Sequence, residues 1–138
     1  MMKQKMGFVL LAGLTLLILA GCRTNQITDI KDAAVPVAIG QKLTMDEVAK
    51  GIVAAGAKHG WAMKIESPGH IVGTLLIRSH TAVVDIPYTT SSYSIIYKDS
   101  TNLNYDAGSK KIHANYSSWV RNLHVAIQRE FGGAGKPN

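Results

Sequence analysis

The sequence predicts an α+β domain: a four-stranded antiparallel meander with one helix before it and one after it, both packed on one face of the sheet. Two changes in hydrophobic period support this fold class. Apolar residues recur at helical spacing from Met45 to Ala55, alternate from Trp61 to Tyr97, and return to helical spacing from Trp119. Short connections between the four alternating segments favour neighbouring antiparallel strands. One apolar face on each element allows helices and sheet to share a core.

The first predicted helix begins after Thr44 and ends before Gly60. In "TMDE", the Thr44 side chain can accept a hydrogen bond from the backbone of Glu47, and the Glu47 side chain can reach back to Thr44. Four apolar residues then share one helical face: Met45, Val48, Ile52 and Ala55. Gly60 suits the left-handed position that follows a last helical turn. The folded domain is therefore expected to start at residue 44.

The four predicted strands lie in "WAMKIE", "HIVGTLLIR", "TAVVDIPY" and "SYSIIYK". Alternate side chains of each strand face the helices. We expect Ser79 and His80 to form a two-residue hairpin loop, which pairs Leu75 with Val84 and Leu76 with Val83. A short fifth strand at 103–105, and another at 35–39, are further elements that the sequence allows.

The opposite face of the sheet is less polar than a solvated face should be. Four apolar residues lie there among charged ones: Val72, Leu76, Val83 and Ile96. Antiparallel sheets with one solvated face usually alternate more cleanly. The set is therefore a candidate partner surface, unless the segment before residue 44 or the 99–114 loop covers it.

The last predicted helix follows a polar, turn-rich segment, and Asn115 or Ser117 can cap it. Three apolar residues recur along it at intervals of four: Trp119, Leu123 and Ile127. The α+β domain is thus assigned to residues 44–131, and residues 132–138 to a flexible tail.

The N-terminus has the pattern of a secretory signal at residues 1–21. Lys3 and Lys5 precede an apolar run at 7–20, which is shorter than the roughly 20 residues of a membrane-spanning helix. The run ends in "LAGC", and its Cys22 is the only cysteine of the chain. This segment resembles the lipobox of bacterial lipoproteins. The resemblance implies cleavage before Cys22 and acylation of its thiol, which is palmitate-type membrane anchoring.

Residues 22–43 show no sustained period, so we interpret them as the acylated cysteine and a flexible tether. Arg23, rather than an aspartate, follows the cysteine, which by analogy with enterobacterial lipoproteins favours the outer membrane, facing the periplasm. Two further segments, 93–106 and 111–127, resemble the C-terminal half of small, functionally uncharacterised Gram-negative lipoproteins. That resemblance bears on location and fold and transfers no catalytic residue.

The charge balance argues against a nucleic-acid partner. The full chain carries net charge +6, and loss of Lys3 and Lys5 leaves 13 basic and 9 acidic residues in the mature chain, or +4. No run of four basic residues occurs. A mild basic excess suits an anionic envelope surface, or simply a solvated one.

The sequence predicts no cofactor, no metal site and no enzymatic activity. The five histidines lack metal-ligand spacing, and neither a Gly-x-Ser-x-Gly elbow nor a glycine-rich phosphate loop is present. The leading interpretation is a lipid-anchored envelope protein that binds another envelope component. The alternative is a small periplasmic hydrolase, for which His80, Asp85 and His113 are the candidate groups.

A glycan-binding module is a further alternative. Tyr97, Tyr105 and Trp119 lie in a region rich in asparagine. Aromatic faces with nearby amides can stack on sugars, although aromatics at such spacing more often belong to a core with a polar tip at its rim.

Overall fold

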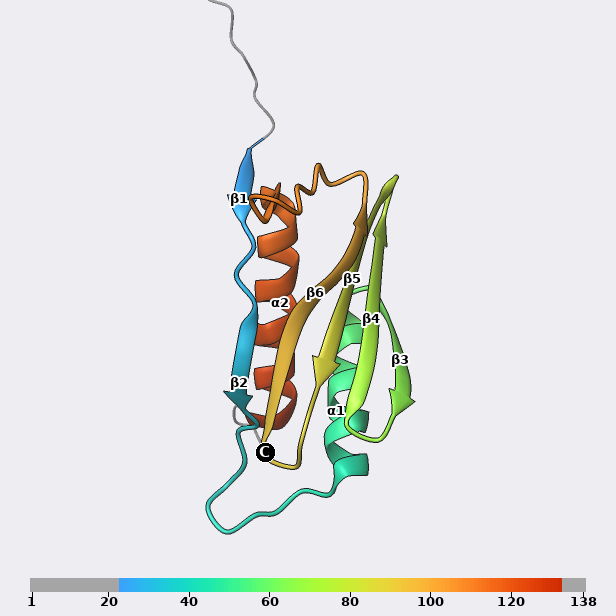
Figure 1. Cartoon of the computed structure of the whole chain (residues 1–138). Helices are drawn as coiled ribbons and strands as arrows, with labels where there is room; N and C mark the ends of the chain where they lie inside the picture. Colours follow the sequence, from blue (N-terminus) through green and yellow to red (C-terminus); the bar gives the residue numbers. More distant parts are fainter. Residues whose placement is uncertain (1–22, 133–138) are drawn as a thin grey trace, which may run out of the picture.

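The computed structural model describes residues 23–132 and places two helices against one face of a five-stranded sheet (Figure 1). The elements in chain order are β1 (Thr24–Gln26), β2 (Ile30–Ala34), α1 (Met45–Lys58), β3 (Trp61–Ser67), β4 (His70–Ile77), β5 (His80–Pro87), β6 (Ser92–Thr101), β7 (Lys111–His113) and α2 (Ala114–Gly132). The antiparallel sheet has the order β2-β6-β5-β4-β3, and β1 pairs with β7 apart from it. The α+β class, with one helix before and one after the meander, is confirmed. The number of four strands is wrong.

The fifth strand, β2, lies in the segment that we interpreted as a tether. It pairs with β6, with Ile30 opposite Ile95 and Ala33 opposite Tyr93, and the register shifts between these two pairs. Asp32 sits in this irregularity with φ of 50°, and its N–H donates to Ser94 Oγ at 3.0 Å. A bulge breaks the alternation from which a strand is normally predicted, which explains why the sequence pattern missed β2.

The two optional strands are also misplaced. Residues 35–39 form no strand. The strand β2 ends at Ala34, and Val35, the next residue, packs in the core. Residues 103–105 lie in a loop, although Leu103 is buried there. The strand of this region is β7, which pairs with β1 and leads directly into α2.

The β4–β5 hairpin loop lies one residue earlier than predicted, which shifts the strand pairing by two residues. Leu75 pairs with Ala82, Thr74 with Val83 and Ile77 with His80, so the two-residue loop is Arg78–Ser79. Arg78 adopts a left-handed φ of 55°, a conformation that glycine or asparagine usually provides in such loops. The predicted pairs of Leu75 with Val84 and Leu76 with Val83 are therefore wrong. Because the shift is two residues, every side chain keeps its predicted face.

The helix termini follow local chemistry. The capping box of α1 is confirmed: Thr44 Oγ1 accepts from the N–H of Glu47 at 3.2 Å, and the Thr44 N–H donates to Glu47 Oε2 at 2.8 Å. Neither residue predicted to cap α2 does so. Instead, α2 starts immediately after β7, and His113 Nδ1 accepts from the N–H of Asn115 at 3.2 Å.

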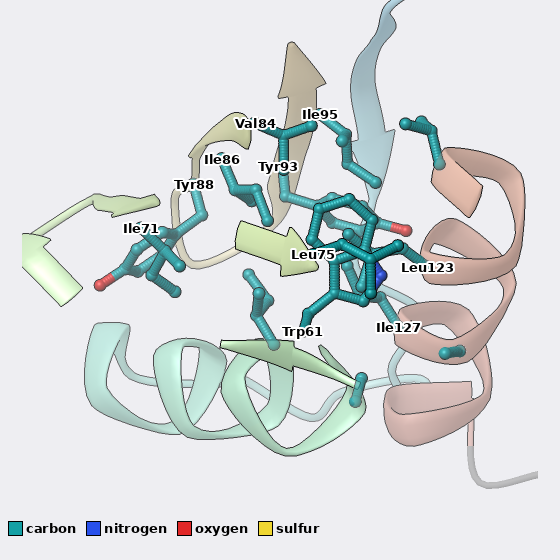
Figure 2. Close-up of a cluster of buried hydrophobic side chains, with 14 of the residues drawn as sticks. Trp61, Ile71, Leu75, Val84, Ile86, Tyr88, Tyr93, Ile95, Leu123 and Ile127 are labelled. Atoms are coloured by element: carbon teal, nitrogen blue, oxygen red, sulfur yellow. The ribbon is translucent and has the colours of Figure 1, made fainter. Parts of the chain in front are cut away.

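The core lies between the helices and the side of the sheet that they cover (Figure 2). The largest side chains with under 2 % exposure come from both helices, from β4, β5, β6 and β7, and from the loop after β6: Tyr93, Tyr116, Ile52, Ile71, Ile86, Ile95, Leu103, Ile112, Leu123, Ile127, Val48 and Val84. Each such aliphatic side chain contributes about 1.5–3 kcal/mol by leaving water. This burial explains why α1 and α2 pack on a single face.

A small polar network ties α2 to the sheet at the edge of this core. The Tyr93 hydroxyl lies 2.9 Å from His124 Nδ1 and accepts from Gln128 Nε2 at 2.8 Å. Gln128 Nε2 also donates to the Ala34 carbonyl of β2 at 2.9 Å. Burial lowers the pKa of His124 and raises the pKa of Tyr93. The network thus joins α2, β6 and β2, three elements distant in sequence.

Candidate functional site

The face of the sheet turned away from the helices, called here the outer face, is crossed by no segment of residues 23–132 (Figure 1). Neither residues 23–43 nor the 99–114 loop covers it. Residues 23–43 provide the edge strand β2, and the loop lies at the end of the sheet beside β1 and β7. The partner-surface candidates Val72, Val83 and Ile96 are partly buried on this face. Leu76 is 68 % exposed at the end of β4.

The four candidates do not form one continuous apolar patch. Asp85 lies between Val72 and Ile96 in the same cross-strand row. Val83 pairs with Thr74 in the next row, and Leu76 pairs with Thr81 beyond it. The outer face therefore combines isolated apolar side chains with polar ones.

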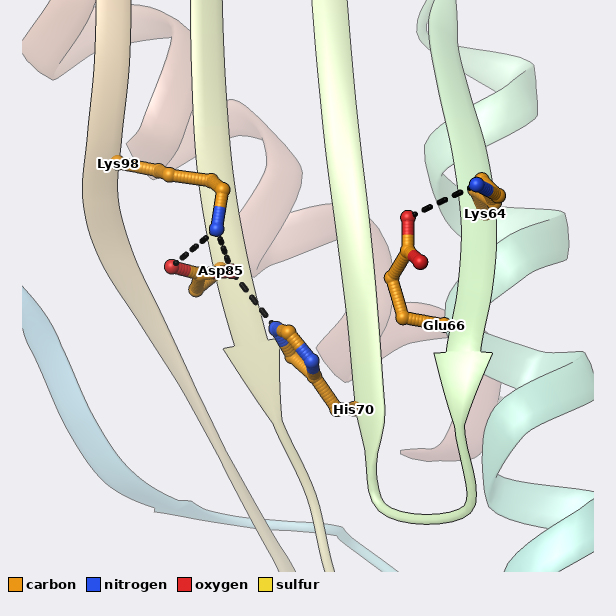
Figure 3. Close-up of polar contacts among 5 residues, drawn as sticks. All are labelled: Lys64, Glu66, His70, Asp85 and Lys98. Carbon is orange, nitrogen blue, oxygen red and sulfur yellow. Dashed lines mark hydrogen bonds and ion pairs between the residues drawn. The ribbon is translucent and has the colours of Figure 1, made fainter.

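Its central polar feature is the Asp85 cluster, formed by His70, Asp85 and Lys98 on three adjacent strands (Figure 3). His70 Nε2 lies 2.7 Å from Asp85 Oδ1, and Lys98 Nζ donates to Asp85 Oδ1 at 3.1 Å and Oδ2 at 3.3 Å. Partial burial raises the pKa of Asp85, but the hydrogen bonds from His70 and Lys98 outweigh it, so the net pKa is lowered. Asp85 is thus held as a carboxylate.

A second ion pair lies beside this cluster, on the edge strand β3. Lys64 Nζ is 3.1 Å from Glu66 Oε1, and both side chains project from the outer face (Figure 3). Because the charges alternate in sign across the face, it is suited to a partner with complementary charges and not to a uniformly charged polymer.

The residues considered for a hydrolase do not converge. Asp85 pairs with His70 and not with His80, whose Nδ1 lies 2.7 Å from the Asn102 carbonyl oxygen. The rings of His80 and His113 stack with centroids 6.4 Å apart at the other end of β5. Within residues 23–132, no serine or threonine hydroxyl hydrogen bonds to a histidine. His70 was not predicted as a partner of Asp85, because the two residues lie diagonally across β4 and β5 and their contact depends on the exact register.

Two of the three proposed glycan-contact residues come together. The rings of Tyr97 and Tyr105 lie 4.4 Å apart, and Tyr116 meets Tyr97 edge-on at 5.6 Å. Tyr97 and Tyr105 line a recess of about 180 Å³ together with Ile27, Asp29 and Lys110. Tyr105 is 39 % exposed, whereas Trp119 packs partly buried against the core. Sequence reasoning identified the tyrosines but missed Asp29 and Lys110, which reach the recess from β-strand connections far apart in the chain.

The proposed acylation site, Cys22, and the signal at 1–21 lie outside the described residues, as do residues 133–138 of the predicted tail. Gly132, which was assigned to that tail, is the last residue of α2. Neither α1 nor α2 has the length and hydrophobicity needed to cross a bilayer. Among residues 23–132, no three histidine or acidic side chains gather as metal ligands would. The described part of the chain therefore offers surfaces and one aromatic recess as its candidate sites.

No protein-family model, no curated protein and no solved structure matches this chain. The sequence pattern at the N-terminus and the geometry of these surfaces are consequently the features that bear on function.

Proposed function

We propose that this protein is a non-enzymatic, lipid-anchored lipoprotein of the cell envelope that binds another envelope protein through the outer face of its sheet. Acylated Cys22 holds it in the membrane, by our proposal the outer membrane with the domain in the periplasm. The observation that carries the binding role is the uncovered outer face, on which partly exposed apolar side chains surround the Asp85 cluster. Protein interfaces combine apolar contacts with polar groups in this way.

Site-specific photo-crosslinking in intact cells tests this role. A photoreactive amino acid at Thr74, in the middle of the outer face, should give a discrete adduct with an envelope protein. The same amino acid at Lys50, an exposed position on α1 on the other side of the domain, should not. The double change Val72→Lys and Val83→Lys should abolish the Thr74 adduct, because it places two charges within the interface.

Val125→Lys is the matched control variant, since Val125 is an exposed valine on α2. An adduct at Thr74 that survives the outer-face double change, or that Val125→Lys removes equally, would exclude the outer face as the binding surface.

Glycan binding is the second candidate, and the recess beside Tyr97 and Tyr105 favours it. An exposed ring with a carboxylate and an ammonium group nearby can stack on a sugar and hydrogen bond to its hydroxyls. Titration with soluble peptidoglycan fragments tests it: Tyr105→Ala should weaken binding and Tyr105→Phe should preserve it. Equal affinities for all three proteins would leave the recess without this role.

A further inference from the structure

Three segments meet at the end of the domain where the chain continues toward Cys22 (Figure 1). This region, the anchor end, comprises Arg23 with β1, the β4–β5 turn at 76–80, and residues 102–113. Asn102 Nδ2 donates to Ser79 Oγ at 2.9 Å. The N–H of His113 donates to the Leu103 carbonyl at 2.8 Å, and the N–H of Ala114 donates to the Arg23 carbonyl at 2.8 Å. The anchor end is therefore one connected surface.

This surface presents apolar side chains to solvent. Leu76 is 68 % exposed, Tyr105 39 % and Ile77 36 %. Leu76 and Ile77 are consecutive residues at the end of β4 and so project to opposite sides of the hairpin tip. Apolar side chains at a protruding tip can enter a membrane interface without moving the sheet behind them.

The same end carries four cations: Arg23, Arg78, Lys110 and Lys111. Within the described residues none of the four forms an ion pair; the same holds for Lys31, Lys42, Arg121 and Arg129, whereas Lys50, Lys58, Lys64 and Lys98 are each paired with a carboxylate. Asp29, Asp99 and Asp106 are the nearby carboxylates, and each accepts a backbone hydrogen bond from its surroundings. A backbone hydrogen bond does not neutralise a carboxylate, so four cations against three carboxylates leave this end with a net charge of +1. The four cations form no ion pair and can contact an external anion.

The covalent chain sets how far this end can lie from a bilayer. Arg23 directly follows Cys22, and Thr24 is already paired with His113. Two residues span at most about 7 Å, whereas a flexible tether of 22 residues would reach about 25 Å. At physiological salt, charges interact over roughly 8–10 Å. Cations at the anchor end are therefore within reach of the surface that holds an acylated Cys22.

We infer that the anchor end docks on the anionic phospholipid headgroups of the leaflet that holds the acyl chains, with Leu76 and Ile77 entering the interface. This inference rests on the acylation of Cys22 in the proposed function. It goes further in giving the domain a fixed orientation: β1 and the β4–β5 tip lie against the bilayer, and α1, with the loop at 35–44, points away from it.

Two of the cations permit a test that does not damage the fold. Arg78 and Lys110 both have left-handed φ, 55° and 53°, where glycine is less strained than any other residue. Arg78→Gly with Lys110→Gly should therefore leave the domain at least as stable while it removes both charges. Lys42→Gln with Lys50→Gln is the matched control, because it removes two charges far from the anchor end.

The experiment uses the acylated protein in vesicles of phosphatidylcholine with or without phosphatidylglycerol. A fluorophore is attached to Ile77→Cys or, as control, to Ile39→Cys, which is fully exposed in the loop at 35–44. Nitroxide-labelled headgroups should quench the label at position 77 in the anionic vesicles and leave the label at position 39 unaffected. Quenching should decrease in 1 M salt, where the screening length falls to about 3 Å.

Sedimentation of the unacylated Cys22→Ser chain with the same vesicles gives the affinity. The Arg78→Gly, Lys110→Gly variant should bind roughly 25-fold more weakly, since one cation near an anionic leaflet is worth about 1 kcal/mol, or about fivefold. The Lys42→Gln, Lys50→Gln variant should bind as wild type does.

Equal quenching at positions 77 and 39, or no dependence on phosphatidylglycerol, would overturn the inference while the anchoring itself stands. The mass of the purified protein reports acylation separately. Absence of lipid on Cys22 would refute the anchor. Weaker vesicle binding by the unacylated Arg78→Gly, Lys110→Gly variant would in that case still show that the anchor end contacts anionic lipid.

Discussion

The two faces of the sheet use the same residue types for different purposes. Val83 and Val84 are neighbours on β5, yet Val84 is 0 % exposed under the helices and Val83 lies partly exposed on the outer face. In the middle of the inner face the apolar side chains are buried and fill the space between the layers, and only Ile65 and Ile77 near strand ends are exposed. The outer face keeps apolar residues that the core does not require. An apolar residue in a strand therefore indicates a binding surface only when it lies on the face that the core does not use.

The largest expected effect comes from a charge on the inner face. Val84→Lys should unfold the domain, because an ammonium group without a partner would replace a fully buried side chain, at a cost that exceeds about 4 kcal/mol. Circular dichroism and chemical denaturation measure it. A cooperative unfolding transition near that of the wild type would show that the inner face tolerates a charged side chain nearly as well as the outer face does.

A smaller effect is expected from added volume within the helix layer. A Cβ at Gly51 of α1 would overlap with the ring of Phe131 of α2. Gly51→Ala should therefore destabilise by about 1–3 kcal/mol through overpacking, partly offset by the higher helix propensity of alanine. Phe131→Leu in the same background should recover part of the loss. A gain in the free energy of unfolding for Gly51→Ala alone would mean that the two helices separate easily.

On the outer face, Asp85→Asn should cost up to about 1 kcal/mol at pH 7, the range for partly exposed ion pairs. The folded-state pKa of Asp85 is lowered, so its stabilisation is present above the ordinary pKa of about 3.9 and is lost as the pH falls through the folded value. The difference between wild type and variant should consequently shrink below about pH 4. A constant difference from pH 7 to pH 3 would show that the lost contribution is not electrostatic.

The smallest effect is expected for Val83→Lys, which should change the free energy of unfolding by about 0.5 kcal/mol or less. It adds a charge one residue away from the most damaging position, but the lysine side chain can extend into solvent from the outer face. Thermal denaturation of Val83→Lys beside Val84→Lys gives the comparison directly. Similar losses in both variants would remove the distinction between the faces.

Much of this architecture follows from local pattern. The Thr44–Glu47 capping box, the alternation from Trp61 to Tyr97 and the helical stripe at Leu123 each specified an element and its buried side. What failed depended on backbone irregularity. The bulge at Asp32 hid β2, and the left-handed conformation of Arg78 moved the hairpin loop by one residue and the strand pairing by two.

The candidate sites were harder to predict because they depend on contacts between distant segments. Tyr97 and Tyr105 could be chosen by residue type, but Asp29 lies 68 residues from Tyr97 in sequence and accepts its N–H at 3.0 Å. His70 and Asp85 become partners only once the β4–β5 register is fixed. No periodicity in a single segment encodes such pairs.

The short β1–β7 ladder has a mechanical consequence. Three residue pairs, from Thr24–His113 to Gln26–Lys111, fasten the first described strand to the start of α2. A force applied at Arg23 acts on these pairs before it acts on the pairing of β2 with β6. The β1–β7 pairs would therefore separate first, and the strands of the meander would remain paired.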